Sequence, residues 1–226
     1  AIWYPMVYEE TPERMRELID AKVDAQFARA MRYVETIGAR AVVPSAGPPA
    51  FLDPDLFQFN VITGDELSIF PDQRSFMSRL ADAGHLGLLA IPGTEIEFGT
   101  EGEIVVSHPL PQAEVDAIFS EKDAYLREYQ ADWLPWLDQM KASWHPPTPD
   151  LLDTVKRWWE PLMAMAPTLC DAVGDVCVFH AGDLAIAIDF PARQVREWAG
   201  EDHAFRFTVQ RELVETVVAA RANDWS

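Results

Sequence analysis

The stretch of sequence that decides the fold of the N-terminal part is Val42-Val43-Pro44-Ser45-Ala46-Gly47-Pro48-Pro49. The apolar run 39–44 predicts a short strand, and Gly47 with the two prolines after it predicts a rigid turn. The loop after a parallel strand lies at the carboxyl edge of its sheet, where α/β folds place their sites. A rigid turn without any ligand explains the same residues, and this alternative stays open. The candidate loop at the sheet edge consists of Ser45, Gly47, Pro48, Pro49 and Asp53.

The segments on both sides of this loop predict a βαβ crossover. Residues 1–8 have the composition of a buried strand, and Thr11-Pro12-Glu13 predicts the capped start of a helix that Gly38 ends. A strand, a long helix and the strand at 39–44, in that order, indicate the crossover. We therefore expect the first half of the chain to be of the α/β type. Its further predicted elements are a helix over 71–83 and short strands over 86–91, 95–98 and 103–106.

The sequence changes character after Pro111, where helical patterns replace short strands. Residues 114–144 predict a helix that Pro135 should kink and that His145-Pro146-Pro147 ends. A second helix should run from Thr148-Pro149 to about residue 172. A hairpin, a third strand and a final helix are predicted over 176–180, 184–190, 204–209 and 212–222. The chain is thus expected to be α+β. Its three regions are the α/β first half, 1–112, a helical connector, 113–147, and a small unit with an antiparallel sheet, 148–226.

Composition and charge restrict the class of partner. The 226 residues carry 18 Lys and Arg against 37 Asp and Glu, which gives a net charge of −19. So acidic a chain has no general attraction to nucleic acid or to anionic membranes. No apolar run reaches the ~20 residues needed to span a bilayer. With only two cysteines, Cys170 and Cys177, no disulfide framework is possible, so we expect a reducing, cytoplasmic location.

Local metal and cofactor motifs are absent from the sequence. The histidines are His85, His108, His145, His180 and His203, and no two have the i, i+2 or i, i+4 spacing that places two imidazoles on one ion. A site assembled from residues far apart in sequence stays open. Both cysteines are expected to be small core residues. There is also no phosphate-binding glycine loop and no nucleophile motif. We therefore predict no metal ligand and no cofactor in this chain, and we assign no catalytic residue.

Tryptophans gather in the connector and in the helix after it. The side chains of Trp133, Trp136, Trp158 and Trp159 are candidates for the lining of an apolar pocket. Their helical spacing is more typical of ordinary packing between helices, which is the favoured interpretation.

Four segments resemble a known family. They are Ala1-Ile2-Trp3-Tyr4-Pro5, the predicted helix after it, the run from Ala41 to Asp53, and Ile69-Phe70-Pro71-Asp72-Gln73. They are similar to the second half of a metallo-β-lactamase-fold domain from large proteins that also carry a Rieske [2Fe-2S] domain, including the CMP-N-acetylneuraminate hydroxylase type. The closing run 221–225 is similar to the lead into a later part of such proteins. The resemblance implies an αββα sandwich in the parent protein, whose first half would carry a His-x-His-x-Asp-His metal motif.

The sequence departs from that family at the metal-binding positions. Where the family's strand leads to a metal-binding histidine, Ser45 or Ala46 stands here. Neither Cys170 nor Cys177 is followed by the histidine of a Rieske pattern. The resemblance therefore implies a parent that is a metal-dependent hydrolase-like protein or a Rieske-type oxidoreductase, with a [2Fe-2S] cluster and a divalent metal. This chain alone is expected to bind neither group and to be inactive.

A second resemblance concerns residues 148–226, whose order of elements is similar to that of sterol-carrier-like lipid-binding domains. Three hypotheses follow for the function. The chain is a catalytically incomplete fragment of a metallo-β-lactamase-fold and Rieske-type redox protein, or a module that binds an apolar small molecule or lipid, or an interaction scaffold. For the scaffold, the unpaired edge of the strand at 1–8 would bind the missing N-terminal half or a second copy of the chain.

Overall fold

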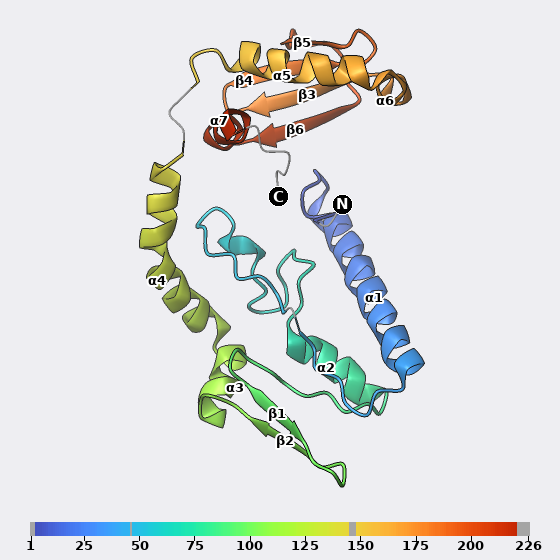
Figure 1. The fold of residues 1–226 in the computed structure, drawn as a ribbon, viewed down its shortest axis with the longest axis vertical. Helices are drawn as coiled ribbons and strands as arrows, with labels where there is room; N and C mark the ends of the chain where they lie inside the picture. Colours follow the sequence, from blue (N-terminus) through green and yellow to red (C-terminus); the bar gives the residue numbers. More distant parts are fainter. Residues whose placement is uncertain (1–2, 46, 145–147, 221–226) are drawn as a thin grey trace. The chain divides into compact units, whose positions relative to one another are not determined.

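The long helix α1, Pro12–Ile37, begins and ends where the sequence predicts. The Thr11 hydroxyl accepts a hydrogen bond from the Arg14 N–H at 3.3 Å. At the other end Gly38 adopts the left-handed conformation, with φ 64°, and its N–H donates to the Val34 carbonyl at 3.0 Å. Figure 1 shows this helix in the computed structural model, which describes residues 3–45, 47–144 and 148–220. The chain divides into two compact units, Ala1–Leu137 and Asp138–Ser226, which are described separately.

The predicted opening strand is wrong for the residues that the structure describes. Residues 3–7 form turns, and the Tyr8 N–H donates to the Pro5 carbonyl at 2.8 Å. Pro5 has no N–H to give to a sheet ladder, so the apolar side chains of this segment pack locally instead. Trp3 contacts the rings of Phe51 and Phe70, and Met6 packs on a cluster of Met15, Ile19 and Ile69. The exposed strand edge expected here is therefore not formed by residues 3–8.

The strand predicted over 39–44 reduces to one bridge. Val42 pairs in parallel with Gly87, and its N–H and C=O bond Leu86 and Leu88 at 2.8 Å each. With the first strand absent and the second reduced to this bridge, the predicted βαβ crossover is wrong. The helix predicted over 71–83 forms as α2, Gln73–Asp82, which packs against α1 through Phe27 and Phe76, whose ring centroids are 5.2 Å apart. A 3-10 turn, η1 (Phe57–Phe59), precedes it, and a hairpin of β1 (Glu95–Phe98) and β2 (Ile104–Ser107) follows.

Two helices occupy the region predicted as one helix over 114–144. They are α3, Gln112–Ser120, and α4, Lys122–Ala142. The break falls at Glu121, whose φ of −120° and ψ of 40° leave the helical region, and Pro135 lies inside α4. The helix is thus interrupted at Glu121, before Pro135, and the kink at Pro135 stays a prediction. No helix among the described residues is long and apolar enough to cross a membrane.

The C-terminal unit is built on a four-stranded sheet in the order β5-β4-β3-β6. The predicted hairpin is confirmed as β3, Val176–Ala181, and β4, Leu184–Asp189. The strand β5, Gln194–Glu197, was not predicted from the sequence, because only Val195 of its four residues is buried. The expectation of an antiparallel sheet is wrong at β6, Phe205–Val209, which pairs in parallel with β3. After β5 the chain returns to the opposite edge of the sheet, so that β6 runs beside β3.

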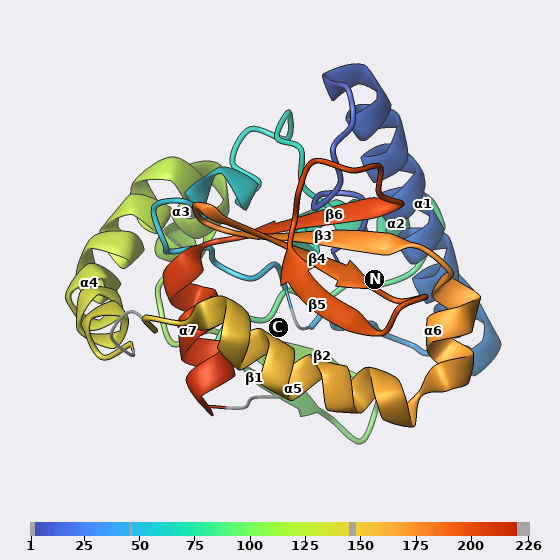
Figure 2. The same ribbon diagram turned by 90° about the horizontal axis from the view of Figure 1, so that it is seen from above.

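The helices of this unit are α5, Leu151–Met165, α6, Pro167–Val173, and α7, Arg211–Ala220. The single helix predicted to residue 172 is divided at Ala166, because the residue before a proline is disfavoured in helical conformation. Figure 2 shows α5 and α7 on the same side of the sheet. The core lies between these two helices and the sheet, and it includes Leu151, Val155, Cys177, Phe179, Ile186, Ile188, Val214 and Val218. The described residues are thus mixed α plus β, which confirms the predicted class.

Candidate functional site

The loop predicted at a sheet edge borders two cavities of the N-terminal unit. Pro48 and Pro49 line a cavity of about 540 Å³, together with residues of α2, α3 and α4. Ser45 and Gly47 line a second cavity of about 390 Å³ beside α1. Asp53 belongs to neither lining, and its carboxylate accepts the Asp55 N–H at 3.0 Å. The structure therefore brings the prolines to a cavity wall but does not bring Asp53 there, and a role for these residues stays a prediction.

Gly47 allows the loop to approach α2 closely. A Cβ added at this position would collide with the side-chain amide of Gln73, the first residue of α2. A larger residue at 47 would therefore have to displace Gln73, which lines both cavities. The glycine of the predicted turn thus has a steric reason that the sequence alone did not show.

A partly buried ion pair lies in the wall of the 540 Å³ cavity. Lys122, the first residue of α4, pairs with Asp72, the N-cap of α2, and their side chains are 17% and 10% exposed. The other Asp72 oxygen accepts hydrogen bonds from the Ser75 N–H and hydroxyl, each at 2.9 Å. Burial opposes ionisation of Asp72, but the bonds from Lys122 and Ser75 outweigh it and hold its pKa below the ordinary value. The pair ties the start of α4 to the start of α2.

A buried amide, that of Asn60, belongs to the same cavity lining. Asn60 accepts the Phe51 N–H and donates to the Phe51 and Phe57 carbonyls, each at 2.9 Å. These bonds use the Oδ1 acceptor and both amide hydrogens, so Asn60 acts as a clamp on the loop 51–60. Neither Asn60 nor the Asp72–Lys122 pair was predicted from the sequence as part of a site. Asp72 could have been found as a helix cap, but no local signal pairs it with a lysine fifty positions away.

The four candidate tryptophans belong to two different units. Trp133 and Trp136 lie on α4, are 41% and 49% exposed, and contact each other edge to face at 5.6 Å. Trp158 and Trp159 lie on α5 and pack, partly buried, on the core of the C-terminal unit. The Trp159 and Phe179 ring centroids are 6.1 Å apart, and Trp158 lines a cavity of about 330 Å³. The common pocket proposed for these four residues stays a prediction.

An apolar surface remains on the helix-covered face of the C-terminal sheet. In the register of β3 with β6, Phe205 pairs with Cys177 and Phe207 with Phe179. Paired residues of neighbouring strands point to the same face, so both phenylalanines share the face of the core. They are nevertheless 38% and 55% exposed, and their ring centroids are 5.6 Å apart. We call Phe205 and Phe207 the β6 apolar patch.

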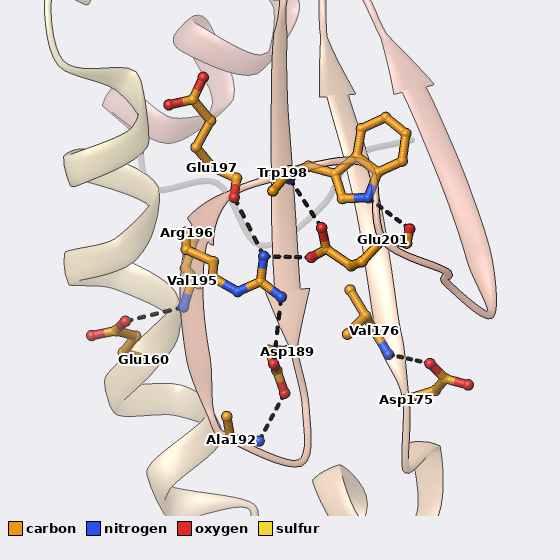
Figure 3. A network of polar contacts seen from close by, with 11 residues as sticks. Glu160, Asp175, Val176, Asp189, Ala192, Val195, Arg196, Glu197, Trp198 and Glu201 are labelled. Atoms are coloured by element: carbon orange, nitrogen blue, oxygen red, sulfur yellow. Dashed lines mark hydrogen bonds and ion pairs between the residues drawn. The ribbon is translucent and has the colours of Figure 1, made fainter.

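A polar network holds β5 and the loop after it, as Figure 3 shows. The Arg196 guanidinium pairs with Glu201, lies 3.7 Å from an Asp189 oxygen and donates to the Glu197 carbonyl at 3.4 Å. The Trp198 indole N–H donates to the Glu201 carbonyl at 3.1 Å, and its ring contacts His180 and His203. These contacts close a loop on the sheet, and they explain the two histidines as packing partners of a tryptophan.

The described residues do not fit a Rieske cluster, which takes two cysteine thiolates and two histidines. Cys170 and Cys177 are both buried in the core of the C-terminal unit. Burial raises the pKa of the Cys177 thiol to about 11, so it is protonated at neutral pH. Across residues 3–45, 47–144 and 148–220 there is no group of three or more His, Cys, Asp or Glu that could hold a metal. His145 lies outside the described residues.

Comparison with known proteins gives two kinds of similarity. Residues 151–226 match the family model of the Rv3818-like, SCP2-like domain. The whole chain is 39% identical, over 231 residues, to a Mycobacterium tuberculosis protein named as Rieske 2Fe-2S iron–sulfur protein Rv3818. It is 38% identical over 234 residues to a Mycolicibacterium smegmatis protein with a Rieske 2Fe-2S name. No solved structure matches the chain.

The alignments cover 100% of this chain but only 44% and 45% of the two relatives. The chain therefore spans less than half the length of the curated relatives that it matches. The resemblance to Rieske-containing proteins and the sterol-carrier-like resemblance of the C-terminal unit are confirmed at this level. Neither comparison names a metallo-β-lactamase fold.

Proposed function

We propose that this chain is part of a Rieske-type redox protein, outside its iron–sulfur domain, and that it is catalytically incomplete by itself. The observation that carries the proposal is the end-to-end match of the chain to less than half of relatives with Rieske names. The buried state of both cysteines agrees with it, because neither thiol is placed to become a cluster ligand. In this proposal the chain contributes binding and positioning surfaces, and electron transfer belongs to another part of the protein.

Within this proposal, residues 1–112 form the second half of a metallo-β-lactamase-like domain and residues 113–147 form a helical connector. The parallel bridge between Val42 and Gly87 supports this assignment, because it lies in the stretch that carries the resemblance. The loop that follows the bridge borders two cavities, as expected for a loop at the end of a parallel pair. A first half that adds strands beside Val42 would turn this bridge into a sheet.

Metal and sulfide analysis tests the redox proposal. The chain of 226 residues and a full-length Rieske-named relative are purified under the same anaerobic conditions, and iron, zinc and acid-labile sulfide are measured. We expect two irons and two sulfides per molecule of the relative, and no stoichiometric metal on the chain alone. Electron paramagnetic resonance of the reduced samples should show a cluster signal in the relative only. Stoichiometric iron or zinc on the chain alone would contradict the proposal.

A second candidate function is the binding of an apolar ligand by the C-terminal unit. The observation that favours it is the β6 apolar patch, which continues the core face of a unit that matches an SCP2-like domain model. Exposed aromatic side chains beside a core are typical of a surface that an apolar molecule covers.

Native mass spectrometry tests this candidate. The full chain purified from cells should carry a lipid-sized adduct that organic extraction removes. Phe207→Ser should reduce adduct occupancy several-fold, because it places a hydroxyl in the apolar patch. Phe98→Ser is the matched control, since Phe98 is 69% exposed on β1 in the other unit. A chain without adduct, or equal losses in both variants, would contradict ligand binding at β6.

A further inference from the structure

The 540 Å³ cavity of the N-terminal unit has the construction of a small-molecule site, and it is independent of the redox proposal. Its volume lies in the range of ~300 to 1,000 Å³ that ligand pockets occupy. Its walls come from the loop at 48–50, the start of α2, the segment before α3, and α3 and α4 themselves. Because these segments are far apart in sequence, the cavity exists only in the folded unit.

The lining is mostly apolar and partly aromatic. Ile118 of α3 and Leu126 of α4 face it together with Pro48 and Pro49, and the rings of Tyr125 and Tyr129 complete the α4 side. Burial of an apolar ligand against such a wall contributes roughly 25 cal/mol per Å² of apolar surface removed from water. The walls therefore favour a ligand with a largely apolar, ring-sized body.

Asp72 and Lys122 are the charged residues of this lining. Both Asp72 oxygens are already occupied, by Lys122 on one side and by Ser75 on the other. A lysine ammonium has three N–H donors, and among the described residues Asp72 is the one ion-pair partner of Lys122. Donor capacity is thus left on the Lys122 ammonium at the cavity wall.

The ion pair also restricts the net charge of a ligand that the cavity can bind. Asp72 and Lys122 together are neutral, so the wall does not attract a net charge of either sign. An anion near Lys122 would be repelled by Asp72 and by a chain of net charge −19, and would lose its hydration in an apolar cavity. An uncharged carbonyl or hydroxyl oxygen can accept a hydrogen bond from Lys122 without that penalty.

We propose that this cavity binds an uncharged, largely apolar small molecule whose carbonyl or hydroxyl oxygen accepts a hydrogen bond from Lys122. Lys122 anchors the polar atom, and the walls from α3, α4 and the Pro48-Pro49 segment enclose the apolar body. The Asp72–Lys122 pair holds the ammonium in place before the ligand arrives.

Fluorescence titration of the full chain with Nile red, an uncharged ring compound with a carbonyl, tests the proposal. Lys122→Met should weaken binding about tenfold, which corresponds to one lost hydrogen bond from a charged donor. Leu126→Trp should weaken it at least tenfold by filling the cavity. The matched control is Leu134→Trp, a change on the same helix about two turns beyond Leu126 and outside the lining, which should leave the affinity unchanged.

A second variant protects the test against misfolding. Lys122→Met leaves Asp72 without its cation, so the double variant Asp72→Asn/Lys122→Met removes both charges and should show the same tenfold loss in a folded chain. The anionic probe anilinonaphthalene sulfonate should bind at least tenfold more weakly than Nile red. An affinity for Nile red that Leu126→Trp and the double variant leave unchanged overturns the proposal. A loss of Nile red affinity that is seen only with Phe207→Ser also overturns it, because it would place the probe on the C-terminal unit. Equal affinity for the anionic probe would contradict the claim that the ligand is uncharged.

Discussion

The two units of this chain are stabilised in different ways. The C-terminal unit has a continuous apolar core between a four-stranded sheet and its helices. The N-terminal unit has a small buried cluster around Ile19, and it is held largely by ring contacts and by polar clamps such as Asn60 and the Asp72–Lys122 pair. A packed core loses stability when a large side chain is replaced by a small one, because a cavity is left behind. A clamp loses stability when one of its hydrogen bonds is removed. The two units should therefore respond to different substitutions.

The largest effect is expected for Phe179→Ala in the C-terminal unit. Phe179 is buried on β3 and contacts Trp159, so its removal should lower the free energy of unfolding by about 3 to 5 kcal/mol. Urea denaturation with hydrogen exchange of β3 peptides measures this loss. Phe207→Ala, at the paired position of β6, is the control and should cost less than about 1 kcal/mol, because its ring is exposed. Equal losses at both positions would show that the core does not end at β3.

A smaller effect is expected for Asn60→Ala in the N-terminal unit. The change removes three hydrogen bonds and leaves the buried Phe51 N–H and C=O without their partner, which should cost about 2 kcal/mol. Protection of peptides 51–60 in hydrogen exchange should fall in parallel. Gln58→Ala is the matched control, because that exposed amide makes one bond to the Asp55 carbonyl at 3.2 Å. A cost for Asn60→Ala no larger than for Gln58→Ala would argue against the clamp.

The smallest effect is a dependence of stability on pH that arises at Glu66 in the N-terminal unit. Burial opposes ionisation of Glu66, but backbone N–H groups, including those of Thr63 and Gly64 at 2.8 Å, outweigh it and lower its pKa from 4.5 to about 2. A carboxylate with a lowered pKa stabilises the fold above the unfolded pKa. This stabilisation should therefore decrease as the pH falls from about 4.5 to 2.

Acid titration of stability, followed in peptides 61–68, measures this dependence. Glu66→Gln should flatten the curve between those pH values, because the amide does not titrate. Glu17→Gln, which removes an exposed carboxylate of α1, serves as the control and should keep the wild-type curve. If Glu66→Gln also keeps the wild-type curve, the loop around Glu66 is not the origin of the acid sensitivity.

Local signals were sufficient for much of the fold. Thr11 and Gly38 determine both ends of α1, and the two residues between β3 and β4 predict the hairpin, because caps and tight turns depend on neighbouring residues. The opening strand was wrong because apolar residues such as Trp3 and Met6 can pack on a helix and a loop as well as in a sheet. The parallel pairing of β6 was missed because it depends on contacts between residues far apart in sequence.

The candidate site was predicted only in part for the same reason. Pro48 and Pro49 were singled out from their own sequence, and the structure places them at a cavity wall. The pairing of Asp72 with Lys122 was not predicted, because the two side chains meet only through the packing of α4 near α2. The tryptophans were grouped by residue type, although the division after Leu137 assigns them to separate units.

The parallel pairing of β6 with β3 has a consequence for the order in which the C-terminal unit folds. β3 and β4 are joined by a tight turn and can pair within microseconds, whereas the chain leaves β5 at one edge of the sheet and must pass β4 and β3 before β6 can pair at the other edge. We therefore expect β6 and its two exposed phenylalanines to join the sheet last. A ligand that binds these phenylalanines would bind only chains in which β6 has joined the sheet. Binding would therefore stabilise the fully folded C-terminal unit relative to the form in which β6 is still unpaired.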